Sequence, residues 1–151
     1  MLVLAFLIGI VAGLRSMTAP AAAAFAARFG GLHVADTPLA FMGYAFTPWI
    51  LGVLALGELV TDKLPSTPSR KVPVQFGGRI LTGGLSGATI GAGSGSLIAG
   101  LLLGALGALV GTLGGAAARG ALARAFGSDR PAALLEDVVA IAAAVMIVSQ
   151  I

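Results

Sequence analysis

Residues 77–119 decide the fold of this chain, and they read GGRILTGGLSGATIGAGSGSLIAGLLLGALGALVGTLGGAAAR. No charged residue lies between Arg79 and Arg119. Glycine recurs about every fourth position, at Gly83, Gly87, Gly91, Gly95, Gly100, Gly104, Gly107, Gly111 and Gly115. In water each glycine costs a helix about 1 kcal/mol relative to alanine, whereas in lipid the backbone must satisfy its own hydrogen bonds and the helix forms anyway. The pattern therefore predicts membrane helices with a glycine zipper, a flat stripe on which a second backbone packs closely.

The uncharged run is too long for one membrane span. At about 1.5 Å per residue it reaches about 58 Å, close to twice the roughly 30 Å hydrocarbon thickness of a bilayer. We expect two helices, 77–92 and 97–126, that fold back at Gly91–Ser96.

The composition of the 151 residues is that of a multi-pass membrane protein. Hydrophobic residues make up 58% and charged residues 10%, whereas soluble domains carry about a quarter charged residues. The net charge of +3 does not indicate nucleic-acid binding, because the chain has no run of lysines and no stacking set of aromatics. With no cysteine and His33 as its one histidine, it offers no disulfide, thiolate or histidine metal site. We expect no metal and no cofactor.

Further apolar stretches complete an all-α polytopic transmembrane bundle of about five spans in a single domain, residues 1–151. The first stretch carries Arg15 near mid-membrane and Pro20 as an expected kink. A signal peptide is the alternative there, but no basic residue precedes its apolar core. The second stretch has Tyr44 and Trp49 as candidate interface aromatics. The spans expected besides the glycine-rich pair are 2–28, 39–61 and 132–151.

Basic residues set the expected orientation, because cytoplasmic loops carry an excess of lysine and arginine. With five spans, Arg28 stands alone on one side. The other side holds Lys63, Arg70, Lys71, Arg79, Arg119, Arg124 and Arg130. This bias predicts a bacterial inner-membrane protein with a cytoplasmic N-terminus and an external C-terminus.

An internal similarity suggests an inverted repeat. Gly9 and Gly13 precede an alanine-rich stretch, as Gly107 and Gly111 do. An odd number of spans would place the two units in opposite orientations, as in many transporters. Chance is the alternative, since alanine and glycine bias produces such matches.

Three segments together resemble a known family: GLRSMTAP at 13–20, ELVTDKLP at 58–65 and GGRILTG at 77–83. They are similar to the bacterial membrane proteins grouped as domain of unknown function 4126, over nearly the whole chain. Longer members have a more acidic and aromatic linker where this chain has STPSR at 66–70, so it looks like a short variant. The resemblance implies an integral membrane protein and no particular activity.

Glu58 and Asp62 are four residues apart and share a helix face. One interpretation is a cation or proton site, because ionisable groups inside a membrane are costly unless they are used or paired. The other is an interfacial cluster, in which Glu58 or Asp62 pairs with Lys63, Arg79 or Arg119 to fix helix ends.

Arg15 is the other costly residue, and a straight first helix would keep it apart from Glu58. Either the helix breaks around Ser16 to Pro20, where Thr18 and freed backbone groups could line a binding cavity, or Arg15 faces carbonyls, water or an anionic ligand. The structural interpretation is an arginine that snorkels from a short, tilted helix. Glu136 and Asp137 are favoured by the N-terminus of the last helix. Alternatively they complete an acidic site with Glu58 and Asp62.

These patterns lead to two main hypotheses for function. The first is a small transporter or channel for an ion or small solute, built as an oligomer in the lipid bilayer. The second is a membrane scaffold or accessory subunit, and a lipid-handling role in which Arg15 meets a phosphate headgroup is a further alternative. We expect no enzymatic activity, because no nucleophile–base pair, phosphate-binding loop or metal-ligand spacing occurs.

Overall fold

The computed structural model describes residues 1–64 and 72–151, and these form helices without any strand. The all-α expectation is therefore confirmed for this part of the chain. Arg70 and Lys71, counted above for the orientation, lie outside it. The elements are α1 (Leu2–Leu14), α2 (Thr18–Phe29), the 3-10 helix η1 (Ala40–Gly43), α3 (Thr47–Thr61), α4 (Pro73–Ala92), α5 (Leu97–Phe126) and α6 (Asp129–Val148).

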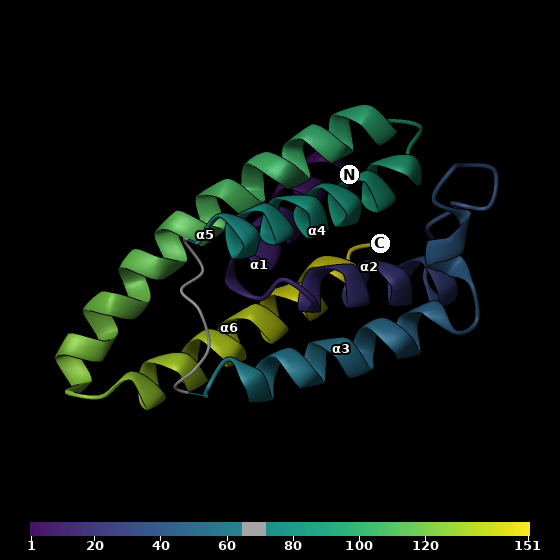
Figure 1. Ribbon diagram of the computed structural model, residues 1–151. Coiled ribbons are helices and arrows are strands. Elements are labelled where there is room, and N and C mark those ends of the chain that lie inside the picture. Colours follow the sequence, from purple (N-terminus) through teal and green to yellow (C-terminus); the bar gives the residue numbers. More distant parts are fainter. Residues whose placement is uncertain (65–71) are drawn as a thin grey trace.

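The helices form two groups of three (Figure 1). One group contains α1, α4 and α5, which make the most extensive helix–helix contacts of the described chain. The other contains α2, α3 and α6, in which α2 contacts both of its neighbours. The groups meet where α5 and α1 pack on α6 and where α2 packs on α4.

Glycines hold the first group together. The chain turns back between α4 and α5 at residues 93–96, as predicted. A methyl group added at Gly104 would collide with the carbonyl oxygen of Gly83, and one at Gly87 with that of Gly100. Such backbone approach, at the van der Waals limit, is what a glycine stripe permits.

Residues 2–28 form two helices and not the one continuous helix that a single span would require. The helix breaks at Arg15, whose backbone is extended (φ −139°, ψ 108°), and α2 runs back antiparallel to α1 (Figure 1). Pro20 explains the break, because its ring would clash with the carbonyl of Ser16, four residues earlier, in a continuous helix. Within the first turn of α2 the missing N–H of Pro20 costs nothing.

The hairpin of α1 and α2 changes the expected topology. The first and last residues of the chain lie at one end of the molecule (Figure 1), where Gly31 also meets Ile151. A five-span bundle would have its two termini at opposite ends, which differs from this arrangement. The supposed inverted units, α1 and α5, run in the same direction, because successive turns of α1 meet Gly107 and then Gly111.

The stretch 39–61 is helical over a shorter range than predicted. The α-helix starts at Thr47, with Pro48 in its first turn, a position where proline starts a helix and does not kink it. Residues 40–43 form only the short η1. α3 packs mainly on α2 and η1.

Two helices of the described chain, α5 and α6, are long and apolar enough to cross a membrane, judged by length and composition. α1 and α3 are apolar but have only 13 and 15 residues. The count of five spans is thus not established.

Candidate functional site

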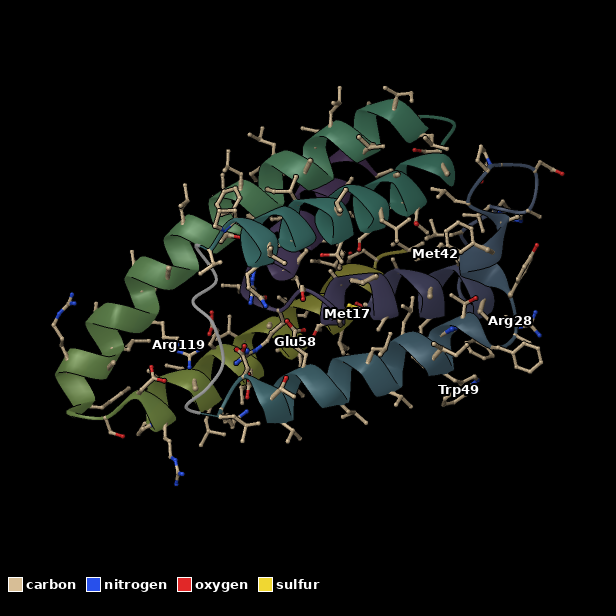
Figure 2. The ribbon with its side chains drawn as sticks, in the orientation of Figure 1. Met17, Arg28, Met42, Trp49, Glu58 and Arg119 are labelled. Atoms are coloured by element: carbon tan, nitrogen blue, oxygen red, sulfur yellow. The ribbon has the colours of Figure 1, made fainter. Side chains whose placement is uncertain are left out.

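A cluster of charged side chains surrounds the break between α1 and α2 (Figure 2). α3, α4, α5 and α6 all contribute to it, so residues far apart in the sequence meet at one point. We call it the charged cluster. Its members are Arg15, Glu58, Asp62, Lys63, Arg79, Arg119, Glu136 and Asp137.

Arg79 of α4 binds the C-terminal end of α1. Its Nη1 donates to the carbonyl oxygens of Gly13 (2.8 Å) and Leu14 (2.9 Å). The last carbonyls of a helix have no partner within the helix, and a cation there also interacts favourably with the helix dipole. Only 3% of the Arg79 side chain is exposed, so these charge-assisted bonds are shielded from solvent.

Glu58 of α3 binds the N-terminal end of α2. Its Oε1 accepts hydrogen bonds from the backbone N–H and the hydroxyl of Ser16, both at 2.8 Å. Its Oε2 accepts one from the N–H of Met17, also at 2.8 Å. A carboxylate at a helix N-terminus satisfies amides that have no helical partner and offsets the positive end of the dipole. Glu58 and Arg79 lie 3.9 Å apart, so the two caps of the break also attract each other.

Arg15 itself is completely buried, with 0% of its side chain exposed. Its guanidinium forms ion pairs with Asp62 of α3 and Asp137 of α6, and lies 3.8 Å from Glu136. Burying an arginine unpaired would be prohibitive. The acidic residues of α3 and α6 thus make its position at the break tolerable.

Arg119 and Lys63 extend the cluster toward the end at which α6 begins. Arg119 donates to both carboxylate oxygens of Asp129 (3.1 and 2.8 Å). It also lies 3.2 Å from Glu136 and 3.5 Å from Asp62. Lys63 pairs with Asp137 and donates to the carbonyl of Leu59 at 2.8 Å.

The charged cluster contains four basic and four acidic side chains, so its formal charges balance. Among the described residues, no group of histidine, aspartate and glutamate is arranged to hold a metal ion. The carboxylates instead face guanidinium or ammonium groups. Chemically, the cluster can hold the ends of α1 and α2 in place.

The structure brings together seven of the eight candidate residues chosen from the sequence. The exception is Thr18, which lines an apolar groove between α2, α3 and α6. The expected contacts of Glu58 with Arg79 and of Asp62 with Arg119 are present. The break near Ser16, one of the alternatives for Arg15, is also present.

Glu136 and Asp137 do not act as helix N-terminal residues. α6 begins at Asp129, so both lie about two turns inside the helix, whereas the dipole effect falls off within the first turn. Instead they contact Arg15 from α6. They share Arg15 with Asp62, but in a cluster of paired charges and not in the acidic site that the alternative described.

Sequence reasoning missed the backbone amides of Ser16 and Met17 as partners of Glu58, and it treated Arg119 only as a pairing partner. Pro20 could have indicated these amides, because a proline at that position makes a new helix start a few residues before it.

A cavity of about 130 Å³ between α5 and α6 adjoins the charged cluster. Apart from Arg119 and Glu136, the residues that line it are apolar.

Comparisons with protein-family models, curated proteins and solved structures found no match. The resemblance to the domain of unknown function 4126 family therefore stays a prediction.

Proposed function

We propose that the chain is an integral protein of the bacterial inner membrane that moves a small ion or solute. Two apolar helices of spanning length support the membrane placement, as do exposed aliphatic side chains such as Leu102 of α5, Val53 of α3 and Met146 of α6. The basic end, with Arg124 and Arg130, faces the cytoplasm. Residues 1 and 151 then lie on the outer side, and the hairpin of α1 and α2 enters and leaves the membrane there.

The observation that carries the transport proposal is the carboxylate of Glu58 bound to the open start of α2. Interrupted helices inside transporters present their free ends to substrates and coupling ions. Such irregular backbone is tolerated at membrane depth only where protein or a cavity surrounds it. In this arrangement the chain's own Glu58 and Arg79 occupy the two ends, which corresponds to a closed state.

Opening follows from the chemistry of Glu58. When the Glu58 carboxylate moves away from the start of α2, its attraction to Arg79 and to the positive end of α2 is lost. The amides of Ser16 and Met17 are then free for another anionic or polar group. A transported ion or solute reaches them from the cytoplasmic end, where Lys63 is the most exposed member of its ion pair.

A second function, that of a membrane scaffold or accessory subunit, is favoured by the mutual pairing of the charges in the cluster. In that case the charged cluster only fixes the hairpin. The lipid-handling alternative based on Arg15 loses its support, because Arg15 is buried and paired.

Cysteine accessibility at the break distinguishes transport from scaffolding, since the chain has no native cysteine. Ser16→Cys keeps the backbone N–H, and Ala88→Cys in the glycine-packed group serves as a buried control. With a membrane-impermeant thiol reagent, transport predicts labelling of Ser16→Cys from the cytoplasmic side, increased by Glu58→Gln, with Ala88→Cys inert. Proteoliposomes should show a proton or ion flux that Glu58→Gln changes. If Ser16→Cys is not labelled, either alone or combined with Glu58→Gln, and no flux is found, the transport function is contradicted and the scaffold function remains.

A further inference from the structure

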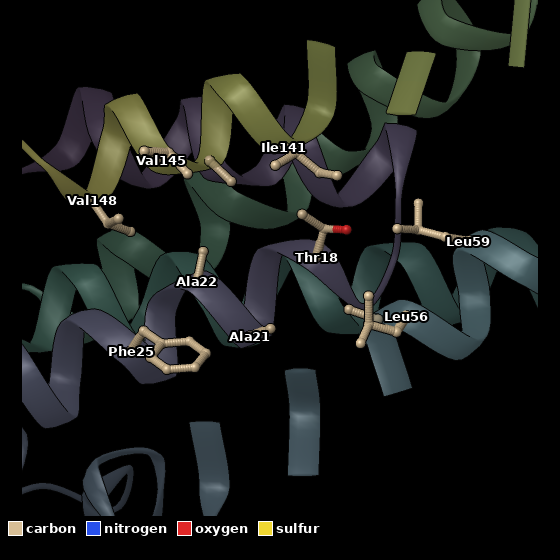
Figure 3. Close-up of a pocket in the computed structure, with 11 residues that line it drawn as sticks. Thr18, Ala21, Ala22, Phe25, Leu56, Leu59, Ile141, Val145 and Val148 are labelled. Atoms are coloured by element: carbon tan, nitrogen blue, oxygen red, sulfur yellow. The ribbon is translucent and has the colours of Figure 1, made fainter. Parts of the chain in front are cut away.

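An apolar groove of about 300 Å³ runs along α2, between α3 and α6 (Figure 3). Thr18, Ala22 and Phe25 lie on its floor at helical spacing, with Leu56 of α3 on one wall and Val145 of α6 on the other. The groove is about 10 Å long, because it follows seven residues of α2 at about 1.5 Å each.

The groove exists because α3 stands apart from α6. Of the residues of α3, only Pro48 is buried, and the helix packs mainly on α2 and η1. Small side chains on α2, such as Ala21 and Ala22, leave the space between the two walls open. In lipid, an open apolar space of this kind fills with hydrocarbon, since an unfilled void forfeits dispersion contacts.

Beyond Phe25, the groove ends near the basic side chain of Arg28. Arg28 and Phe29 continue the Thr18–Ala22–Phe25 stripe by one helical turn. The Phe25 ring stacks edge-on against Trp49 at 5.3 Å, and Arg28 lies 6.0 Å from the centre of the Phe29 ring. Arg28 is exposed, and no ion pair is found for it within residues 1–64 and 72–151. Arg28 and Trp49 lie at the same end of the molecule (Figure 2).

We propose that this groove binds one acyl chain of an outer-leaflet phospholipid, whose phosphate pairs with Arg28. Aromatic side chains such as Trp49 and Phe29 mark the headgroup level of a membrane protein, and a guanidinium suits a phosphate group. The hydrocarbon tail then passes Phe25 and runs inward along Ala22 toward Thr18. This proposal rests on the membrane placement in the proposed function but not on transport.

A helix from a second copy is the other occupant that an open apolar groove could take. Arg28 favours the phospholipid, because the apolar face of a helix offers no partner for a guanidinium. An extended hydrocarbon chain fits, whereas water would find almost no polar partner apart from the Thr18 hydroxyl.

The test uses the full chain and a phosphatidylglycerol probe that carries a photoactivatable diazirine on one acyl chain. Protein that stays with membranes after alkaline carbonate extraction is reconstituted in vesicles with the probe, irradiated and mapped by peptide mass spectrometry. Ala22→Trp and Ala55→Trp fill the groove from its floor and from the α3 wall. Ala142→Trp is the matched control, because Ala142 is exposed on α6 and does not line the groove.

The proposal predicts probe attachment to the groove-lining peptides of α2, α3 and α6. It predicts about tenfold less attachment in Ala22→Trp and Ala55→Trp, equivalent to about 1.4 kcal/mol, and unchanged attachment in Ala142→Trp. Arg28→Gln should weaken attachment of this probe but not of a diacylglycerol probe, which has no phosphate. Equal attachment in all variants, or a cross-link between two copies through Ala22→Cys, would overturn the lipid site. Failure to remain with the membrane would instead overturn the membrane placement.

Discussion

Arg15 shows how a single side chain can require a whole set of partners. It lies at the break of the hairpin with no exposed surface, and two carboxylates from different helices compensate its charge. Removing one partner of a buried ion pair costs more than forming the pair contributes, because the remaining charge stays buried. The stability of the break should therefore depend on charge balance more than on any one contact.

Arg15→Met should lower the free energy of unfolding by about 2–3 kcal/mol. This is less than the full cost of breaking a buried ion pair, because Asp62 keeps Arg119 and Asp137 keeps Lys63 as a partner. Adding Asp137→Asn should recover part of the loss, since one charge of each sign is then removed. Thermal unfolding of the detergent-solubilised protein measures both effects. Arg130→Met is the control, because Arg130 is exposed at the start of α6; equal midpoints for Arg15→Met and Arg130→Met would contradict the prediction.

At the residue scale, sequence identified the charges but not their geometry. Residue type alone shows that it costs free energy to bury an arginine, or the acids near it, in an apolar stretch. Which acid meets Arg15 depends on the antiparallel return of α2 and on the register of α6. These are set by contacts more than 100 residues away, as between Arg15 and Asp137.

At the scale of elements, the glycine-packed group and the hairpin follow different rules. α4 and α5 meet through backbone contacts at Gly83, Gly87, Gly100 and Gly104. The glycine repeat in the sequence of these two helices predicts that interface. The hairpin depends on Pro20 together with side chains supplied by α3 and α4. An apolar stretch of this length suits one long helix as well as two short ones, so composition predicted a single span.

Gly104→Ala should destabilise the bundle by about 1–3 kcal/mol through overpacking, because the new methyl group would meet the backbone of Gly83 and Gly87. Gly114→Ala on the same helix should instead be neutral or stabilise it by up to about 1 kcal/mol, since no atom lies within 4 Å of the added methyl group. Unfolding midpoints of the two variants in the same detergent measure the difference. Equal effects would mean that α4 and α5 do not pack as described.

At the scale of the whole molecule, the hairpin brings the two ends of the chain toward one end of the bundle. A continuous first helix would carry residue 28 away from residue 1, whereas the hairpin of α1 and α2 turns the chain back (Figure 1). Arg119 lies toward the other end (Figure 2), and Arg124 lies in the last turn of α5, just before the turn to α6. The clustering of basic charge was thus predictable from the sequence. The inferred position of the N-terminus was not, because it depended on the number of spans.

Protease-cleavable tags at both termini should be cut from the same side of sealed membrane vesicles. A third tag inserted after Gly127, in the turn between α5 and α6, should be cut only from the opposite side. Vesicles of both orientations, treated with a protease that cannot cross the bilayer, provide the measurement. Cleavage of the two terminal tags from opposite sides would show that α1 and α2 form a single crossing.

The capping of the hairpin by later helices also constrains how the protein is made. Arg15 leaves the ribosome about 120 residues before Asp137, which at roughly 5–20 residues per second is a delay of about 6–24 s. Glu58 and Arg79, which cap the two short helices, follow Arg15 by 43 and 64 residues, and the counter-charges of Arg15 are complete only with Asp137. The hairpin therefore reaches its final geometry only after the rest of the chain has been synthesised.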